Sequence, residues 1–470
     1  MLNHMLNWNA KLKFSFFIIL FITAAVRVLS PDTIVSPDSH RYINAGLNVA
    51  AYGTLSNQAY APNRPPEPGL AMAGVFTPFE IATASRLNQA THESLLCIVT
   101  ARIWSDCKLD IPALKVFYTL EIFIFHAAVF FIGRLVFGND IKALFAVALS
   151  FAFKDTKAYG NTILAEPSYM MASALFLLVW LYAWKHPDRL KVWFLCGLAL
   201  GLTILIKSAW IALLPAFGVL ALLVTFWARD TRFLAFRSIS VLALGTVIVL
   251  TPLFVRNVVQ LDFWGLSDPI YLGVQFAHRF AYNAMTWGEW ARGWIYYLPD
   301  FGDKAAYALF GQEAVDKLSW DANSYYVHGR DVLHQEAVAA ASPQTASRYL
   351  LENYFFNDPV KGAAVTALLV WRGIFVGNLV GLAAVLLAGP VLYFSCSAAR
   401  RNIVILALPI IIMAGVHGLV SVSIHRYNIP LVIPYALIMA QFLYAITTAG
   451  AERLPSRFMA MAQRFLPKPG

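Results

Sequence analysis

Long apolar runs separated by short polar segments recur along this chain, and they constrain its fold more than any other feature. The runs are about 12 to 24 residues long, and most approach the length that a helix needs to cross a bilayer. Of the 470 residues, 59% are hydrophobic and only 13% are charged. A water-soluble domain cannot cover so much apolar surface. The sequence therefore predicts an all-α polytopic membrane protein.

We expect about ten transmembrane helices, with both termini in the cytoplasm because Lys and Arg cluster in the loops assigned to that side. The first run ends at Arg27 without a small-residue cleavage site, so we interpret it as an uncleaved signal anchor. The expected spans are approximately Phe14–Leu29, Leu114–Phe137, Lys142–Phe153, Pro167–Trp184, Val192–Ile206, Ala209–Trp227, Ile239–Val255, Gly373–Phe394, Ile403–Ser421 and Ile429–Thr448.

Two long polar stretches are expected on the external side and should contain amphipathic helices. The first, residues 30 to about 112, is too polar and Pro-rich to span, and we expect it to lie partly as helices on the membrane. The larger holds twelve acidic and seven basic residues, in contrast to the basic loops assigned to the cytoplasm. No internal repeat is evident, which argues against many secondary transporters. The chain thus divides into a transmembrane module, 1–256, that contains the first external loop, 30–112; a large external loop, 257–371; and C-terminal helices with a cytoplasmic tail, 372–470.

The formal net charge of +10 does not require a nucleic-acid partner, because the positive-inside rule explains the basic residues. The four cysteines contain no Cys-x-x-Cys pair, so dithiol or metal chemistry on cysteines is not expected. Cys97 and Cys107 both lie in the first external loop. An oxidising compartment permits a disulfide there, and two unrelated buried thiols are the equal alternative.

Asp38 is the first candidate catalytic residue, because it follows the first apolar run and therefore lies at the mouth of a membrane helix. A carboxylate at that depth can accept the proton of a hydroxyl while a lipid-borne substrate approaches through the bilayer. Arg41 and Tyr42 lie one helical turn further on and are candidate substrate-binding residues. The alternative is structural: the sequence Ser-Pro-Asp-Ser is suited to the N-cap of a helix that begins near Ser39.

Several further short motifs occur in a fixed order. They include an Arg-Pro-Pro segment at 64–66, Glu166-Pro167, a Gly-rich run that ends in Lys207, the sequence Pro252-Leu253-Phe254-Val255-Arg256-Asn257, Asn357-Asp358-Pro359 and His425-Arg426-Tyr427. Together with Asp38-x-x-x-Tyr42, this order resembles the polytopic C-type glycosyltransferases that use polyprenyl-phosphate sugars, the family of bacterial protein-mannosyltransferase and aminoarabinose-transferase relatives. Many members carry two adjacent acids where this chain has Asp38-Ser39, which argues against a metal site built on such a pair.

The resemblance implies a membrane glycosyltransferase with its active site on the external face of the bacterial inner membrane. It implies catalytic roles for Asp38 and Glu166, and donor binding by Lys207, Arg256, His425, Arg426 and Tyr427. Glu166 has a structural alternative, since an acid beside Pro167 suits a helix N-terminus. Snorkelling to the interface also explains Lys207, Arg256 and Arg426.

The expected reaction moves a hexose or pentose from a polyprenyl-phosphate donor to a glycolipid, lipopolysaccharide or protein acceptor, with inversion. The leaving phosphate is a good one, so no cofactor is required, although a divalent metal remains an alternative. A flippase for a lipid-linked saccharide and a non-catalytic scaffold are the rival functions. Glu121 and His126 also lie in an apolar run, about 140° apart around a helix, and we expect them to serve packing.

Overall fold

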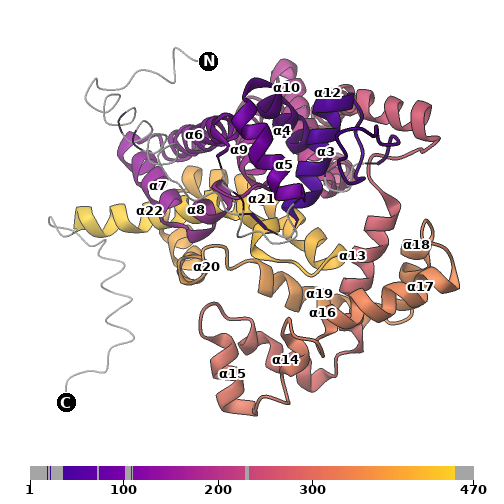
Figure 1. Ribbon diagram of the computed structural model, residues 1–470. Coiled ribbons are helices and arrows are strands. Elements are labelled where there is room, and N and C mark those ends of the chain that lie inside the picture. Colours follow the sequence, from indigo (N-terminus) through magenta and orange to yellow (C-terminus); the bar gives the residue numbers. More distant parts are fainter. Residues whose placement is uncertain are drawn as a thin grey trace.

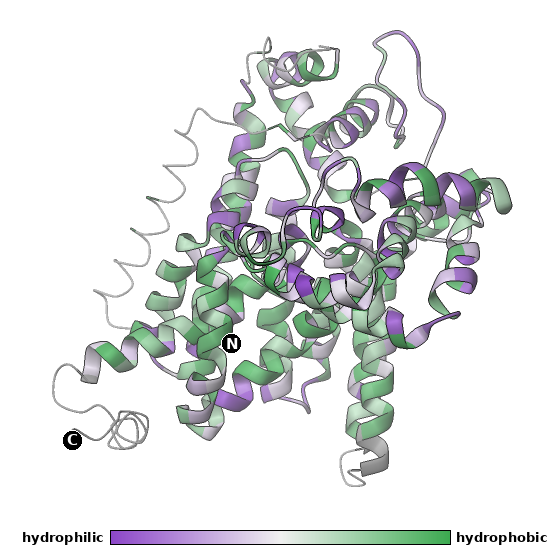
Figure 2. Cartoon of the chain, turned by 90° about the horizontal axis from the view of Figure 1, so that it is seen from below, coloured by the Kyte–Doolittle hydropathy of each residue, from purple (hydrophilic) through white to green (hydrophobic). Residues whose placement is uncertain are grey.

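The computed structural model describes residues 35–449, apart from residue 37 and the segments 71–73, 101–106, 108–109 and 228–231, together with the single positions Ile18 and Ile22. Every regular element in these described residues is helical, which confirms the expected all-α architecture. Hydrophobic residues gather on helices that run side by side, and hydrophilic residues gather in the segments beyond one end of them (Figure 2).

Five segments are long and apolar enough to cross a membrane: α6 (Pro112–Phe137), α9 (Glu166–Lys185), the part Leu234–Leu261 of α12 (Arg232–Leu261), α21 (Ser397–Val420), and His425–Thr448, which combines η7 (His425–Leu431) with most of α22 (Val432–Ala449). Three shorter apolar segments accompany them: α10 (Leu190–Ile206), Ser208–Leu223 in η2 (Ser208–Ala212) and α11 (Leu213–Trp227), and α20 (Leu379–Phe394). The chain is therefore a multi-pass membrane protein.

The expected count of ten spans is not confirmed. The segment expected at Lys142–Phe153 forms α7 (Asp140–Ala152), whose 13 residues extend only about 20 Å and cannot cross a hydrocarbon core by themselves. The segment expected at Gly373–Phe394 is interrupted before Leu379, where α20 begins. The first expected span lies outside the described residues except for Ile18 and Ile22. Hydropathy identified the apolar runs but could not show where the helices within them begin and end.

Helix α10 packs closely between α9 and α12 because glycines line its contact with α12. A Cβ atom at Gly197 would lie 2.0 Å from the carbonyl oxygen of Leu242, and one at Gly201 would lie 2.7 Å from Cβ of Val249. Such small residues let two backbones approach in the apolar phase, where packing rather than the hydrophobic effect holds helices together. The Gly-rich run before Lys207 thus fixes the position of α10.

The bundle has two chemically different ends. At the basic end, the Lys185 ammonium donates to the carbonyl of Leu135, Arg134 pairs with Asp140, and Asn402 donates to the carbonyl of Val136. The opposite end gathers the start of α9 and the ends of α10 and α21, the elements that carry the candidate site. This grouping agrees with the alternation of loops expected from sequence.

The segment between the first two expected spans folds into three helices, α3 (Ser39–Tyr52), α4 (Phe76–Leu87) and α5 (Gln89–Thr100), which lie together in Figure 1. Cys97 and Cys107 form a disulfide with a Cα–Cα distance of 5.8 Å, so the bridged alternative holds. The backbone N–H of Val75 donates to the carbonyl of Leu205 over 2.9 Å and ties this unit to the end of α10.

The large polar segment after α12 is a second helical unit, drawn in pink to orange in Figure 1. Its elements are α13 (Pro269–Ala281), η3 (Tyr282–Ala284), α14 (Trp287–Tyr296), α15 (Gly302–Phe310), η4 (Asp316–Leu318), α16 (Tyr325–His328), η5 (Gly329–Leu333), α17 (His334–Ala340), α18 (Ala346–Leu350), η6 (Leu351–Phe355) and α19 (Pro359–Gly373).

Arg279 joins this unit to the bundle. Its fully buried guanidinium donates to the carbonyls of Gly418 in α21 and Gly362 in α19 and to two side-chain oxygens, at 2.8–2.9 Å.

Candidate active site

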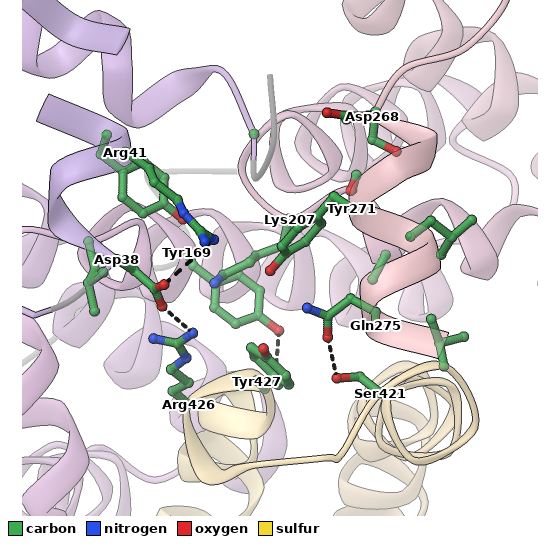
Figure 3. Close-up of a pocket in the computed structure, with 18 of the residues that line it drawn as sticks. Asp38, Arg41, Tyr169, Lys207, Asp268, Tyr271, Gln275, Ser421, Arg426 and Tyr427 are labelled. Carbon is green, nitrogen blue, oxygen red and sulfur yellow. Dashed lines mark hydrogen bonds and ion pairs between the residues drawn. The ribbon is translucent and has the colours of Figure 1, made fainter. Parts of the chain in front are cut away.

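A cavity of about 350 Å³ opens at the end of the bundle opposite the basic end. Helices α3, α9, α13 and α21, together with η2 and η7, bring residues to it that are up to 389 positions apart in the chain, from Asp38 to Tyr427. Figure 3 shows its polar groups. Seven of the nine residues proposed from the sequence line this one cavity: Asp38, Arg41, Tyr42, Glu166, Lys207, Arg426 and Tyr427.

Asp38 occupies the N-cap position of α3, yet its side chain makes no capping hydrogen bond. Instead, Asp38 Oδ2 accepts a hydrogen bond from Arg426 Nη2 at 2.7 Å. Asp38 Oδ1 lies 3.8 Å from Arg41 Nη1, beyond hydrogen-bond distance, and 34% of the side chain is exposed. The capping alternative is therefore wrong for this carboxylate, which faces the cavity with one oxygen held and the other accessible.

Glu166 and Lys207 form the second ion pair of the cavity. Lys207 Nζ lies 2.9 Å from Glu166 Oε1, and Arg426 Nε lies 4.0 Å from the same oxygen. The Glu166 side chain is only 1% exposed, and its Oε2 has no hydrogen-bond partner among the described residues. Glu166 is also the first residue of α9, so its role at a helix start is compatible with its place in the site.

Three aromatic residues fix the position of the Lys207 ammonium. Its Nζ lies 5.7 Å from the ring centroid of Tyr169 and 5.6 Å from that of Tyr427, within the range of cation–π attraction. The Tyr169 hydroxyl donates to the carbonyl of Tyr427 and accepts from Trp210 Nε1, both at 2.9 Å. The ammonium is thereby held between two rings, and hydrogen bonds fix the side chain of Tyr169 and the backbone of Tyr427.

The charged groups around Asp38 and Glu166 give this part of the cavity a positive excess, because Arg41, Lys207 and Arg426 outnumber the two acids. Burial raises the pKa of the Tyr42 hydroxyl well above its ordinary value, and the charge of nearby Glu166 adds to that effect. Tyr42 therefore stays neutral and able to donate a hydrogen bond.

The opposite wall of the cavity belongs to α13 and α21 (Figure 3). Gln275 Oε1 accepts from the hydroxyl of Ser421 at 2.6 Å, and Tyr271 adds a hydroxyl whose pKa is raised by burial. Asp268 also lines the cavity, but one of its oxygens caps α13 by accepting from Ile270 N at 2.9 Å. Apolar side chains line the remaining surface: Leu55, Pro78, Leu164, Ile211, Val416 and Val420.

Two predicted substrate-binding residues, Arg256 and His425, do not line the cavity. Arg256 donates to the carbonyl of Leu55 at 2.9 Å and to the side chain of Asn257 at 3.0 Å, so it supports the wall from behind. His425 hydrogen-bonds to the backbone of Arg372 instead. His425 is the first residue of η7, and its neighbours Arg426 and Tyr427 are the ones that reach the cavity.

Two intramembrane residues noted in the sequence have packing partners. His126 Nδ1 lies 2.8 Å from the hydroxyl of Ser150, as expected for a packing role. Glu121 is buried beside Glu80 of α4, which accepts from Ser168 at 2.8 Å. The sequence did not indicate this meeting of two acids.

Sequence reasoning missed Tyr169, Tyr271, Gln275 and Ser421. Tyr169 could have been found, since it lies within the Glu166-Pro167 motif. Nothing in the sequence distinguishes Tyr271 and Gln275 from the rest of the large polar segment. Within the described residues, no group of three or more His, Cys, Asp or Glu side chains is arranged to hold a metal ion.

No protein-family model matches the sequence, and no curated protein matches it. Among solved structures, the chain is similar to the archaeal oligosaccharyltransferase AglB from Archaeoglobus fulgidus in complex with an inhibitory peptide and a dolichol-phosphate, with a TM-score of 0.48 and 14% identity over 97% of this chain. The match covers 53% of AglB, so the chain spans about half the length of that protein.

The chain is also similar to ArnT from Cupriavidus metallidurans. The TM-score is 0.38 for ArnT bound to undecaprenyl phosphate and 0.37 for its apo state, each with 15% identity over 91% of this chain and 76% of that one.

Proposed function

We propose that this protein transfers a single sugar, a hexose or pentose, from a polyprenyl-phosphate donor to a hydroxyl of an envelope acceptor, on the external face of the bacterial inner membrane. One observation carries the proposal: a partly exposed carboxylate, Asp38, shares a cavity with the cations Arg41, Lys207 and Arg426 beside an apolar wall. A polyprenyl-phosphate sugar has a group for each of these features. Its apolar chain suits the apolar wall, its anionic phosphate suits the cations, and its sugar would lie between the phosphate and an acceptor hydroxyl near Asp38.

The reaction is a single displacement at the anomeric carbon. The acceptor oxygen forms a bond to that carbon as the bond from the carbon to the phosphate oxygen breaks, and the configuration inverts. Asp38 Oδ1 accepts the proton of the acceptor hydroxyl, because Oδ2 is already held by Arg426 at 2.7 Å. The fixed Oδ2 orients the carboxylate before the acceptor arrives.

Lys207 and Arg426 stabilise the leaving phosphate. Charge builds up on that phosphate in the transition state, so preorganised cations act more strongly there than on the bound donor. Lys207 is held between the rings of Tyr169 and Tyr427, and no reorganisation is needed to present its ammonium. This chemistry needs no metal, since the phosphate is a good leaving group once its charge is balanced.

Glu166 has two parts in this scheme. Its Oε1 accepts a hydrogen bond from Lys207 Nζ at 2.9 Å and so fixes the ammonium. Its buried Oε2 has no donor among the described residues, and it is suited to accept a hydrogen bond from a hydroxyl of the sugar or the acceptor. Buried oxygens without partners are rare in folded proteins, and a substrate hydroxyl would satisfy this one.

The test begins with mass spectrometry of envelope glycoconjugates from cells with and without the protein. We expect one hexose or pentose to disappear from a glycolipid, lipopolysaccharide or protein when the protein is absent. Purified protein should then release polyprenyl phosphate from the corresponding donor when the acceptor is present. If the lipid-linked sugar crosses the membrane intact and no polyprenyl phosphate is released, the protein is a transporter and the proposal is wrong.

A further inference from the structure

Helix α15 carries two different apolar surfaces. Gly302 and Ala306 are buried against the protein. A second stripe lies on another face and runs through Phe301, Ala305, Ala308 and Leu309, at the spacing of one side of a helix. Phe301 is 44% exposed and Leu309 is 65% exposed, so nothing in the described protein covers this stripe.

The two charged residues of α15 lie outside that stripe. At 100° per residue, Asp303 and Lys304 project about 160° and 60° away from Phe301, respectively, so Lys304 borders the stripe on the side away from the buried face. Both charged side chains are exposed. A short helix with a buried edge, a charged edge and an uncovered apolar stripe between them fits a boundary between water and an apolar phase.

Asp300 fixes the depth of this stripe relative to the bundle. Its Oδ1 accepts from Asn378 Nδ2 at 2.6 Å, and its Oδ2 accepts from the backbone N–H of Leu379 at 3.3 Å. Leu379 is the first residue of the apolar helix α20 and is 51% exposed. Phe301 directly follows Asp300, so it lies at the level at which α20 begins.

Helix α14 packs against α15 and carries a row of tryptophans. Its tryptophans form a ladder in which the ring centroids of Trp287 and Trp290 lie 5.9 Å apart, those of Trp290 and Trp294 5.6 Å apart, and those of Trp294 and Trp371 5.4 Å apart. Trp371 Nε1 donates to the carbonyl of Trp294 at 3.0 Å. The ladder ends at Trp287, which is 56% exposed.

We propose that α14 and α15, residues 287–310, lie in the headgroup layer of the bilayer that surrounds the bundle, with Trp287, Phe301 and Leu309 inserted toward the acyl chains. The occupant of the stripe is lipid, because Asp300, which directly precedes Phe301, is hydrogen-bonded to the start of the apolar helix α20, whose Leu386 and Tyr393 are 67% and 73% exposed. Tryptophan rings favour this layer, where one edge of the ring is wet and the body is apolar. Figure 1 shows α14 and α15 extending away from the helices of the bundle.

The experiment uses the full-length protein in nanodiscs of phosphatidylethanolamine and phosphatidylglycerol, with a nitroxide label on single cysteines. Cys396 is exposed and is replaced by serine, while Cys196 is buried and Cys97–Cys107 is bridged, so neither interferes. Labels are placed by F301C and L309C on the stripe. The matched control is D303C, which projects about 160° away from Phe301 on the same helix. Collision rates are measured with oxygen, which concentrates in lipid, and with a water-soluble nickel chelate.

We expect the ratio of oxygen to nickel collisions to be several-fold higher at positions 301 and 309 than at position 303. Equal ratios at all three positions would place the helix in water and overturn the proposal. Low collision rates with both reagents at 301 and 309 would also overturn it, because that result indicates a covering protein. Collision rates do not depend on catalysis, so their result tests the membrane contact of α15 independently of the proposed glycosyl transfer.

Discussion

Replacement of Asp38 by asparagine distinguishes a catalytic role of this carboxylate from a structural one. Asparagine has nearly the same shape and keeps an oxygen that can accept from Arg426, but it cannot take up a proton. The hydrogen bond of 2.7 Å becomes one between a cation and a neutral amide. Hydrogen bonds to charged groups contribute about 1.5–3 kcal/mol and ordinary ones about 0.5–1.5 kcal/mol, so the exchange costs about 1 kcal/mol, and less here because both partners are partly exposed.

A loss of about 1 kcal/mol changes an equilibrium only about fivefold, which leaves a stable protein folded. Removal of a general base slows a reaction by about 10²–10⁴-fold. A large fall in turnover therefore cannot come from weaker folding. Donor affinity should not fall either, because Arg426 loses a competing negative charge and remains free to bind the phosphate.

The assay is the release of polyprenyl phosphate by purified protein, with donor binding measured separately. The matched control is D268N, because Asp268 also lines the cavity and caps α13, and asparagine caps helices as well as aspartate does. We expect D268N to keep nearly full turnover. Loss of a general base should leave about a hundredth of wild-type turnover or less. If D38N keeps more than about a tenth of wild-type turnover, Asp38 is not the base. An equal loss in D268N would show that the assay responds to any charge lost from the cavity.

Three other perturbations test separate parts of the structure. Lys207→Ala should weaken donor binding as well as slow transfer, because the phosphate loses its counter-charge both in the bound state and in the transition state; unchanged binding in a calorimetric titration would contradict this. Arg279→Met should lower the free energy of unfolding by several kcal/mol, since it leaves the buried carbonyls of Gly362 and Gly418 without a donor, and a thermal shift within error of wild type would refute it. A cysteine at Arg330 should react with an impermeant reagent from the external side only, and labelling from the cytoplasm would overturn the orientation.

The pH dependence of the large polar unit follows from His278. Burial, together with the charges of Arg330 and His334, lowers its pKa from 6.5 to about 4. The folded state thus favours the neutral ring, so the associated stability is present above pH 6.5 and is lost as the pH falls through about 4. Hydrogen exchange in α13 and η5 should accelerate over that interval. His278→Phe should flatten the dependence, and an unchanged profile would point to another group.

The sequence by itself determined the class of the protein and most of its chemical groups. Apolar runs of span length require a membrane, because no soluble fold can cover them, and the positions of Lys and Arg between the runs group the loops into two sets. Asp38 could be identified from its place directly after the first apolar run, whereas Glu166 and Lys207 were identified because the order of short motifs around them resembles a known family. Arg256 shows the limit of such sequence reasoning. It also lies near the end of an apolar run, yet in the structure its side chain lies behind the cavity wall.

Only the tertiary structure decided which of these groups meet. Asp38 and Arg426 are 388 positions apart, and their pairing depends on the placement of the start of α3 beside η7, which no local pattern encodes. The same holds for Tyr271 and Gln275, which reach the cavity because the unit after α12 folds back over it. The end of α7 at Ala152 and the start of α20 at Leu379 were likewise known only from the structure, because hydropathy measures transfer to lipid and does not locate helix ends.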